Sequence, residues 1–321
     1  NSGDGDYGGA SLTLSRAVSA SADDVFSFLS GNGISQSGND LLKSGQVIAS
    51  FDLTTPGELL LNFTNANGQI PTTADVNAIA GQIAYSNSSD TPPVSVQVDW
   101  RLNDGNVLAQ GSGGALQDSG SITVMITGQN DAPVFTSLDD NPTFQELPPP
   151  FVSVPVQFDV DVSISDPELD ALNGGLGNYA GATLTIARDG GRNPDDYFFV
   201  LTDNGITFDG TNLNKGGSAL ASFDRSVPGQ LTITFNTATT AEVNDVLRQT
   251  LYGNSNELAP ASVDMELTFN DGNVLAQGQG SDASTSGMVT VNIVNYNELP
   301  VFGDLDASPS FIEDTSAIVM D

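Results

Sequence analysis

A nine-residue sequence, NDGNVLAQG, occurs twice without change, at residues 103–111 and 270–278. The two copies start 270 − 103 = 167 residues apart. Self-similarity at a fixed offset is typical of a duplicated domain, because each copy must bury the same apolar positions. The 321-residue chain is therefore expected to form two domains of one fold.

Apolar residues alternate on both sides of the repeated sequence. Residues 95–102 (SVQVDWRL) and 262–269 (SVDMELTF) precede it, and residues 121–127 (SITVMIT) and 287–294 (GMVTVNIV) follow it. A period of two predicts half-buried strands, and the Asp-Gly pair between them predicts a turn. Trp100 is in register with Leu267, so we expect it in the core rather than as a platform for sugars.

Composition narrows the possible functions. The chain has 40 acidic and 8 basic residues, neither His nor Cys, and a formal net charge of −32. This charge disfavours nucleic acid and anionic lipid as partners and favours cations. The missing His and Cys leave little for acid-base or thiol catalysis, so we expect a protein that is not an enzyme. No apolar run is long enough to predict a membrane span.

One helix is expected in each copy. Residues 239–251 repeat apolar side chains at helical spacing, and Thr239 with Glu242 forms a capping-box pattern. Thr72 with Asp75 resembles it in the first copy. The remaining sequence is short alternating segments separated by Gly, Asn, Asp and Pro, which predicts an all-β fold of sandwich domains.

Two similar junctions set the expected domain boundaries. Residues 130–135 (NDAPVF) and 297–302 (NELPVF) are again 167 apart, which gives domains 1–131 and 132–298 and a last segment, 299–321. The first copy is expected to lack its opening strand, whereas residues 305–314 (LDASPSFIED) repeat residues 138–146 (LDDNPTFQE). The last segment is then the opening strand of a third repeat in a longer array, or a strand donated to the open groove of another molecule.

Oxygen donors gather near the junctions, and they are the candidate ligands of a hard cation. Calcium takes six to eight oxygens from several chain segments, and crowded carboxylates repel one another without it. The candidates are Asp104, Asn130, Asp131, Glu146, Asp166, Glu168, Asp271, Asn297, Glu298 and Glu313. Turn formation is an equally good reading of Asp104 and Asp271, and backbone capping is an alternative for Asn130 and Asp131.

Other acidic pairs are less specific. Asp139 and Asp140 are expected in a solvated turn. The pairs 23–24 and 195–196 precede a strand in both copies, so they form a solvated loop or bind a second ion.

Several phrases resemble one known family. SDPELD (165–170), NYAGATLTIARDGG (178–191), GGSALASFD (216–224), the repeated sequence and NDAPVF look like the cadherin-like tandem repeats of large secreted bacterial proteins, which include calcium-dependent adhesins of the RTX type and other surface repeat proteins. The resemblance implies Greek-key sandwiches of the cadherin or immunoglobulin kind, calcium at the linkers, and export from the cell. By similarity, Asn130 and Asp131 correspond to the linker motif and Glu146 to the acidic ligand of the first strand. Gly128, Gln129 and Glu298 depart from the motif, which leaves the number of ions open.

Three functions are compatible with these features. The first is a calcium-stiffened structural or adhesive segment of an extracellular surface protein, whose partners are neighbouring repeats of the same chain. The second is a filament subunit joined to identical subunits by its C-terminal strand. The third is a carbohydrate-binding module. The adhesion target is not encoded in any recognisable pattern.

Overall fold

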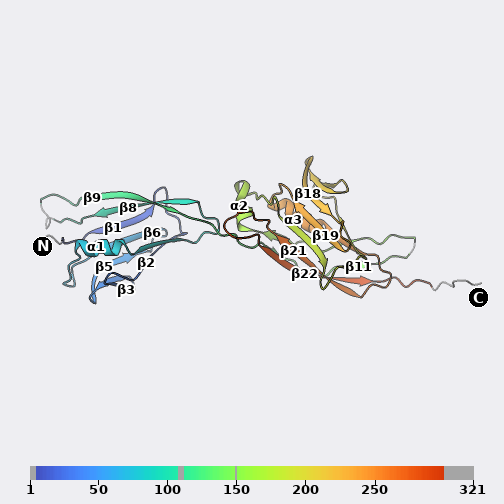
Figure 1. Ribbon diagram of the computed structural model, residues 1–321, viewed down its shortest axis with the longest axis horizontal. Helices are drawn as coiled ribbons and strands as arrows, with labels where there is room; N and C mark the ends of the chain where they lie inside the picture. Colours follow the sequence, from blue (N-terminus) through green and yellow to red (C-terminus); the bar gives the residue numbers. More distant parts are fainter. Residues whose placement is uncertain (1–4, 108–111, 149, 300–321) are drawn as a thin grey trace, which may run out of the picture. The chain divides into compact units, whose positions relative to one another are not determined.

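The computed structural model describes residues 5–107, 112–148 and 150–299, which form two compact units (Figure 1). The first unit contains the residues up to Asp131 together with Asn273–Ser281, and the second contains Ala132–Gly272 and the residues from Asp282 onward. The segment expected to supply a third opening strand or a donated strand, with Glu313, lies outside the described residues.

The first unit is built from two sheets and one helix. Its strands are β1 (Ser11–Arg16), β2 (Asp24–Phe28), β3 (Ile34–Ser37), β4 (Asp40–Lys43), β5 (Gln46–Asp52), β6 (Glu58–Phe63), β7 (Ile83–Asn87), β8 (Ser95–Asn103) and β9 (Gln117–Met125), and its helix is α1 (Thr73–Ala80). The large sheet has the order β3-β4-β5-β6-β1-β8-β9, and β2 pairs with β7 in the small one. All these pairings are antiparallel.

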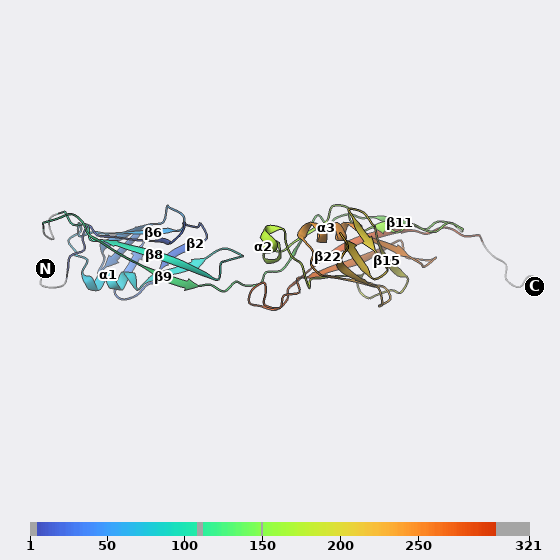
Figure 2. The same ribbon diagram turned by 90° about the horizontal axis from the view of Figure 1, so that it is seen from above.

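The core of the first unit lies between these sheets. Alternate residues of β1, β6 and β8 face inward, as their period of two predicts, and Leu59 and Leu61 are completely buried. Phe26 of β2 packs edge-on against Tyr85 of β7, with ring centroids 5.7 Å apart. Because both sheets contribute to one apolar cluster, the unit is a β-sandwich (Figure 2).

The second unit repeats this plan and adds elements. Its strands are β10 (Val134–Thr136), β11 (Thr143–Gln145), β12 (Val156–Gln157), β13 (Ser163–Ser165), β14 (Thr183–Arg188), β15 (Asp196–Val200), β16 (Ile206–Phe208), β17 (Asn212–Lys215), β18 (Ser218–Asp224), β19 (Gln230–Phe235), β20 (Thr250–Asn254), β21 (Ser262–Asn270) and β22 (Ser284–Val294), and its helices are α2 (Pro167–Gly175) and α3 (Thr240–Gln249). The large sheet has the order β11-β22-β21-β14-β19-β18-β17-β16, beside a sheet β12-β20-β15 and the pair β10-β13. The expected all-β sandwich fold is confirmed in both units.

The predicted helices are present, and both begin with a complete capping box. Thr72 and Asp75 at α1, and Thr239 and Glu242 at α3, exchange hydrogen bonds between side chain and backbone in both directions. The second unit also has α2, an addition to the one helix expected per copy. Its start is encoded by Asp166 as N-cap and Pro167 in the first turn. No helix in the described part of the chain is long and apolar enough to cross a bilayer.

The repeated Asn-Asp-Gly has the same structural role in both units. The side chain of Asn103 or Asn270 accepts the glycine N–H two residues on, at 2.8 Å in each case. Gly105 and Gly272 have positive φ, and a Cβ on either would lie within 2.3 Å of a backbone oxygen. Only glycine fits there, which explains why the Asp-Gly pair is unchanged between copies.

In the second copy, the residues that follow the Asn-Asp-Gly turn have a different role from the turn itself. Asn273–Ser281, which joins β21 to β22, is grouped with the first unit because it pairs with residues 128–130. Gln279 N–H donates to the Gly128 carbonyl and its own carbonyl accepts from Asn130 N–H, each at 2.9 Å. The backbone of this linker is therefore hydrogen-bonded rather than free.

The second residues of the acidic pairs 23–24 and 195–196 are buried, so they do not belong to a solvated loop. Asp24 is 4% exposed and Asp196 3% exposed. Each accepts two hydrogen bonds from an arginine, Arg16 or Arg188, and others from a tyrosine and an asparagine. The Arg16 guanidinium holds the pKa of Asp24 below its usual range. A built-in arginine thus supplies the countercharge that an ion was expected to supply.

Trp100 packs against the core of the first unit, as expected, but at its margin. It lies on the apolar face of β8, but it is only partly buried, whereas its counterpart Leu267 is 2% exposed. The reason is that nothing in the described first unit covers this part of the sheet.

Neutralising Asp196 should strongly destabilise the second unit. In Asp196→Asn the Arg188 guanidinium, whose side chain is 17% exposed, loses its charged partner. Breaking a buried pair costs about 3–5 kcal/mol, so chemical denaturation should show the second unit unfolding at much lower denaturant. The control is Asp245→Asn, which breaks a more exposed contact of 3.4 Å with Lys215 and should cost about 1 kcal/mol or less. Equal effects of the two variants would contradict this assignment.

Candidate cation site

Asp166 is placed by the start of α2. It directly follows β13, has extended backbone angles (φ −146°, ψ 122°) and caps the helix. Its Oδ1 accepts the Leu169 N–H at 2.9 Å. The side chain is 0% exposed. A capping carboxylate usually lies at the surface, so complete burial of this one requires an explanation.

Asp271 is a second buried carboxylate close to Asp166. It follows β21, is also 0% exposed, and accepts the Ala283 N–H at 3.0 and 3.1 Å with its two oxygens. Burial raises the pKa of Asp166, and the negative charge of Asp271 raises it further. We call this pair the Asp166/Asp271 site. Both residues belong to the second unit.

Two more acids lie on the same turn of α2. Asp170 accepts the Asp166 N–H at 3.2 Å and the hydroxyl groups of Tyr179 and Thr240. The negative charge of Asp170 is a further cause of the raised pKa of Asp166. Glu168, the other acid on this turn, is buried, with 6% of the residue exposed. Burial, followed by the contact with Asp170, raises the pKa of Tyr179, so this phenol stays a neutral donor.

One oxygen of the Asp166/Asp271 site lacks a hydrogen-bond donor. Oδ2 of Asp166 is buried and has no hydrogen-bond partner among the described residues. A buried carboxylate oxygen without a donor, in a group whose pKa is raised further by a second carboxylate, is costly unless a proton or a cation compensates the charge. Calcium prefers such oxygen ligands, and Asp166 and Asp271, with Glu168 beside them, are the residues that would hold it.

The structure brings only some of the predicted ligands together. Asp104 lies in the first unit, where its Oδ1 accepts the N–H groups of Asn106 and Leu116 at 3.0 and 2.9 Å. These bonds are those of a turn, which was the alternative reading. Asn130 donates its side-chain amide to the Ser281 carbonyl at 3.3 Å, and Asp131 is exposed at the end of the linker.

Glu146 is a correction to the expected cluster. It follows β11, which runs parallel to β22, so Glu146 lies beside the last residue of β22 and accepts the Tyr296 N–H at 2.8 Å. Asp271 binds Ala283, just before the first residue of β22. The two acids are thus at opposite ends of the second unit, as are α2 and β11 in Figure 1. Asn297 and Glu298 are exposed near the Glu146 end, and Glu313 is outside the described residues.

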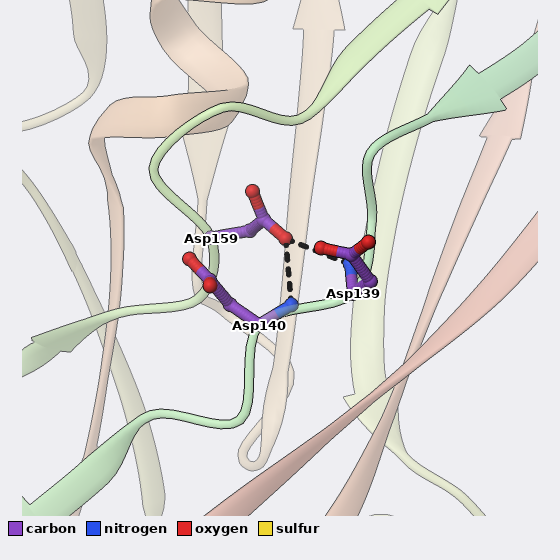
Figure 3. A group of neighbouring side chains, drawn as sticks. All are labelled: Asp139, Asp140 and Asp159. Atoms are coloured by element: carbon purple, nitrogen blue, oxygen red, sulfur yellow. Dashed lines mark hydrogen bonds between the residues drawn. The ribbon is translucent and has the colours of Figure 1, made fainter.

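A third acidic group was expected to be a solvated turn. Asp139, Asp140 and the buried Asp159 each offer an oxygen within 4.8 Å of the others (Figure 3). Asp159 accepts four backbone N–H groups, from residues 139, 140, 161 and 162. These bonds outweigh the effect of burial and lower the pKa of Asp159. The group organises two turns, and a buried Asp inside the apolar run FDVDV is the signal that could have found it.

Comparisons with known proteins leave the family open. No family model and no curated protein matches the sequence. Among solved structures, the chain is similar to protocadherin gamma B2 extracellular cadherin domains 1–5 (15% identity, 86% of this chain and 34% of that one, TM-score 0.29). It is also similar to mouse protocadherin-24 EC1–3 (11% identity, 76% and 53%, TM-score 0.27). The chain thus spans only part of these proteins, and TM-scores this low carry no argument, so the fold rests on the sheets themselves.

Without divalent cations, the contribution of the Asp166 carboxyl to the stability of the second unit should fall as pH rises. The pKa of Asp166 is higher in the folded state than its ordinary value, which applies to the unfolded state. At pH values between these two pKa values, the folded state therefore binds more protons than the unfolded state. The free energy of unfolding therefore falls as pH rises through that window, and the loss persists above it. Burial is the largest cause of the raised pKa, followed by the negative charges of Asp271 and Asp170, whereas the backbone N–H groups of Leu169 and Glu168 lower it.

The comparison that isolates this effect is Asp166→Asn, since asparagine keeps the capping oxygen and loses the charge. Chemical denaturation in chelator at several pH values should show wild type falling below the variant as pH rises. A difference between the two that does not change with pH would refute the assignment.

Proposed function

We propose that this chain is a segment of an extracellular structural or adhesive repeat protein, and that calcium bound at the Asp166/Asp271 site stiffens it. Its partners are then the neighbouring repeats of the same chain. The observation that carries the proposal is the pair of fully buried carboxylates, one of which has an oxygen with no hydrogen-bond partner among the described residues.

The rest of the molecule is consistent with this proposal. The other buried carboxylates have built-in compensation, from arginine at Asp24 and Asp196 and from backbone N–H groups at Asp159. Asp166 differs from them because its Oδ2 is buried with no hydrogen-bond partner among the described residues, while Asp271 and Asp170 add negative charge. A site that is electrostatically incomplete in the protein alone is suited to a cation supplied by the surroundings, and extracellular fluids commonly contain free calcium at the concentrations that weak modular sites need.

Tandem sandwiches also suit a structural role. Each unit has its own core, and the linker residues 128–130 are hydrogen-bonded to the loop before β22. Domains joined in series are expected to move relative to one another unless something restrains them, and a bound cation is one such restraint. The net charge of −32 keeps such chains soluble and makes their stiffness sensitive to divalent cations.

The carbohydrate-binding alternative has less support. The partly exposed Trp100 is the only tryptophan, and its indole lies against Gly120 of β9, with ring atoms 2.7–2.9 Å from the place of a Cβ. The neighbouring backbone therefore covers part of the ring. A free aromatic face with polar groups around it would be the signature of a sugar site.

Calcium should stabilise the second unit, and the gain should depend on Asp166. A ligand at a hundredfold excess over its Kd adds about 2.7 kcal/mol to the free energy of unfolding. Thermal melts in calcium and in chelator should separate for wild type and nearly coincide for Asp166→Asn. In chelator at neutral pH the variant should be the more stable protein, because it no longer buries an uncompensated charge.

The matched control for these melts is Asp189→Asn, which removes one exposed carboxylate from the same unit. It should respond to calcium like wild type. A calcium response that survives in Asp166→Asn, or that disappears in Asp189→Asn, would reject the site.

Stiffening can be measured separately from stability. Small-angle scattering of the whole chain should give a narrower distribution of dimensions in calcium than in chelator, and Asp166→Asn should give the broader distribution in both. Identical curves for wild type in the two conditions would mean that calcium, even if bound, has no structural role.

A further inference from the structure

The second unit has two aromatic side chains on the outer face of its small sheet. Tyr197 and Phe199 alternate on β15 with Phe198, which is 1% exposed, so the two rings point away from the core. Phe199 is 44% exposed, and Tyr197 is partly exposed. The two rings meet edge to face, with an angle of 85° and 5.5 Å between their centroids. They present apolar surface at a sheet face that no other element of the second unit covers completely.

The sheet beneath the two rings is adapted to one of them. Tyr197 is directly opposite Gly253 of β20. A Cβ on Gly253 would collide with the phenol ring, so this ring lies over the glycine. The φ of Gly253 lies outside the positive range that favours glycine. Space for the tyrosine ring, rather than backbone geometry, is therefore what the missing side chain provides.

The corresponding positions of the first unit are not aromatic. Residues 23–34 match residues 195–206 in sequence, so Val25 and Ser27 take the places of the two aromatic residues. Ser86 of β7 is opposite Val25, at the place of the glycine. The strand pair β2-β7 thus forms without the rings, as does its fold. The aromatic pair and the glycine beneath it are specific to the second unit.

An arginine lies at the edge of this face. Strand β15 is an edge strand of its sheet (Figure 2), and Nη1 of Arg225 donates to the Phe198 carbonyl at 2.9 Å. The guanidinium carbon is 5.4–5.7 Å from the ring centroids of Phe199, Phe208 and Phe223. Arg225 therefore occupies a backbone acceptor that an added strand would need, which disfavours a peptide partner at this edge. Arg225 is exposed, and a guanidinium has further N–H donors for a ligand.

A carboxylate and an amide lie beyond the other end of the aromatic pair. Asp195 precedes Tyr197 by two residues, and its carbonyl accepts the Ser255 N–H at 2.9 Å, so the strand pairing continues through it. Asp195 is therefore on the same face as Tyr197, about 7 Å further along the strand. Its Oδ2 accepts the side-chain amide of Asn256 at 3.0 Å, and both side chains reach solvent. Hydrogen-bonding groups thus flank the rings on both sides.

We propose that this face binds a neutral saccharide whose ring hydroxyl groups are equatorial, as in a β-linked glucose chain. We call it the Tyr197 surface, and it consists of Asp195, Tyr197, Phe199, Arg225 and Asn256. In such a sugar the hydroxyl groups lie around the ring and leave apolar C–H faces, which pack on aromatic side chains. The surrounding carboxylate, amide and guanidinium then bind the hydroxyl groups. The formal net charge of −32 disfavours an acidic saccharide.

The Tyr197 surface is separate from the proposed calcium function. It shares no residue with the Asp166/Asp271 site, so the two proposals can fail independently. Asp166→Asn should lose the calcium response of the melts and still bind saccharide with the affinity of wild type. Its structural partners remain the neighbouring repeats, whereas the saccharide is a ligand of the second unit alone.

The test is a calorimetric titration of the whole chain with cellohexaose, a chain of β-linked glucose units. Tyr197→Val, which introduces the residue of the first unit, should weaken binding at least about tenfold, as loss of a central aromatic contact does. Gly253→Ser should also weaken it, because the new side chain displaces the Tyr197 ring while both rings remain. The matched control is Tyr296→Val, which removes a tyrosine of the same unit that is 40% exposed and should bind as wild type does.

Two further measurements keep the test decisive. The double variant Tyr197→Val with Gly253→Ser restores the pair found at Val25 and Ser86, so its melting temperature should show a folded second unit that does not bind. An acidic oligogalacturonate should bind wild type more weakly than cellohexaose does. Absence of cellohexaose binding, equal affinity of wild type and Tyr197→Val, loss of binding in Tyr296→Val, or tighter binding of the acidic saccharide would each overturn the proposal.

Discussion

Buried negative charge is the constraint on which most of this structure depends. The chain has forty acidic residues and buries several of them, and an uncompensated buried carboxylate is costly. The chain compensates Asp24 and Asp196 with arginine, and Asp159 with four backbone N–H groups. Each arginine pair ties two strands together, and the backbone N–H groups around Asp159 join two turns.

Asp166 is compensated less completely than these carboxylates, because one of its oxygens is left without a hydrogen-bond partner among the described residues. That difference is why a cation is proposed there and not at the other acids.

Duplication makes the two units useful controls for each other. The Asn-Asp-Gly turn is the same in both, because the glycine must approach a neighbouring backbone within a distance that excludes a side chain. The aspartate in the middle of this turn has different surroundings in the two units. Asp104 is partly exposed and bonds to turn amides, whereas Asp271 is buried beside Asp166. One sequence motif thus serves turn formation in both copies, and a candidate ligand role arises only where α2 brings further acids to it.

Comparing the two units also shows which structural features the local sequence patterns predict and which features they do not. The alternation in β8 and β21 correctly predicts the faces of both strands, but not that Trp100 would remain partly exposed, because exposure depends on whether another segment covers the face. The capping boxes at Thr72 and Thr239 were predictable because the interaction is local. Glu146 was expected with the linker acids and lies at the other end of its unit, because the parallel pairing of β11 with β22 is a long-range choice.

The sequence by itself determined the duplication, the all-β sandwich fold, the capped helices and the strongly acidic surface, since each of these follows from local pattern or from composition. Only the tertiary structure decided which carboxylates are buried and what compensates each one. It brought Asp271 close to Asp166 and paired Asp24 and Asp196 with arginine. The physical reason is that burial and charge compensation depend on residues far apart in the chain, so they exist only once the sheets have assembled.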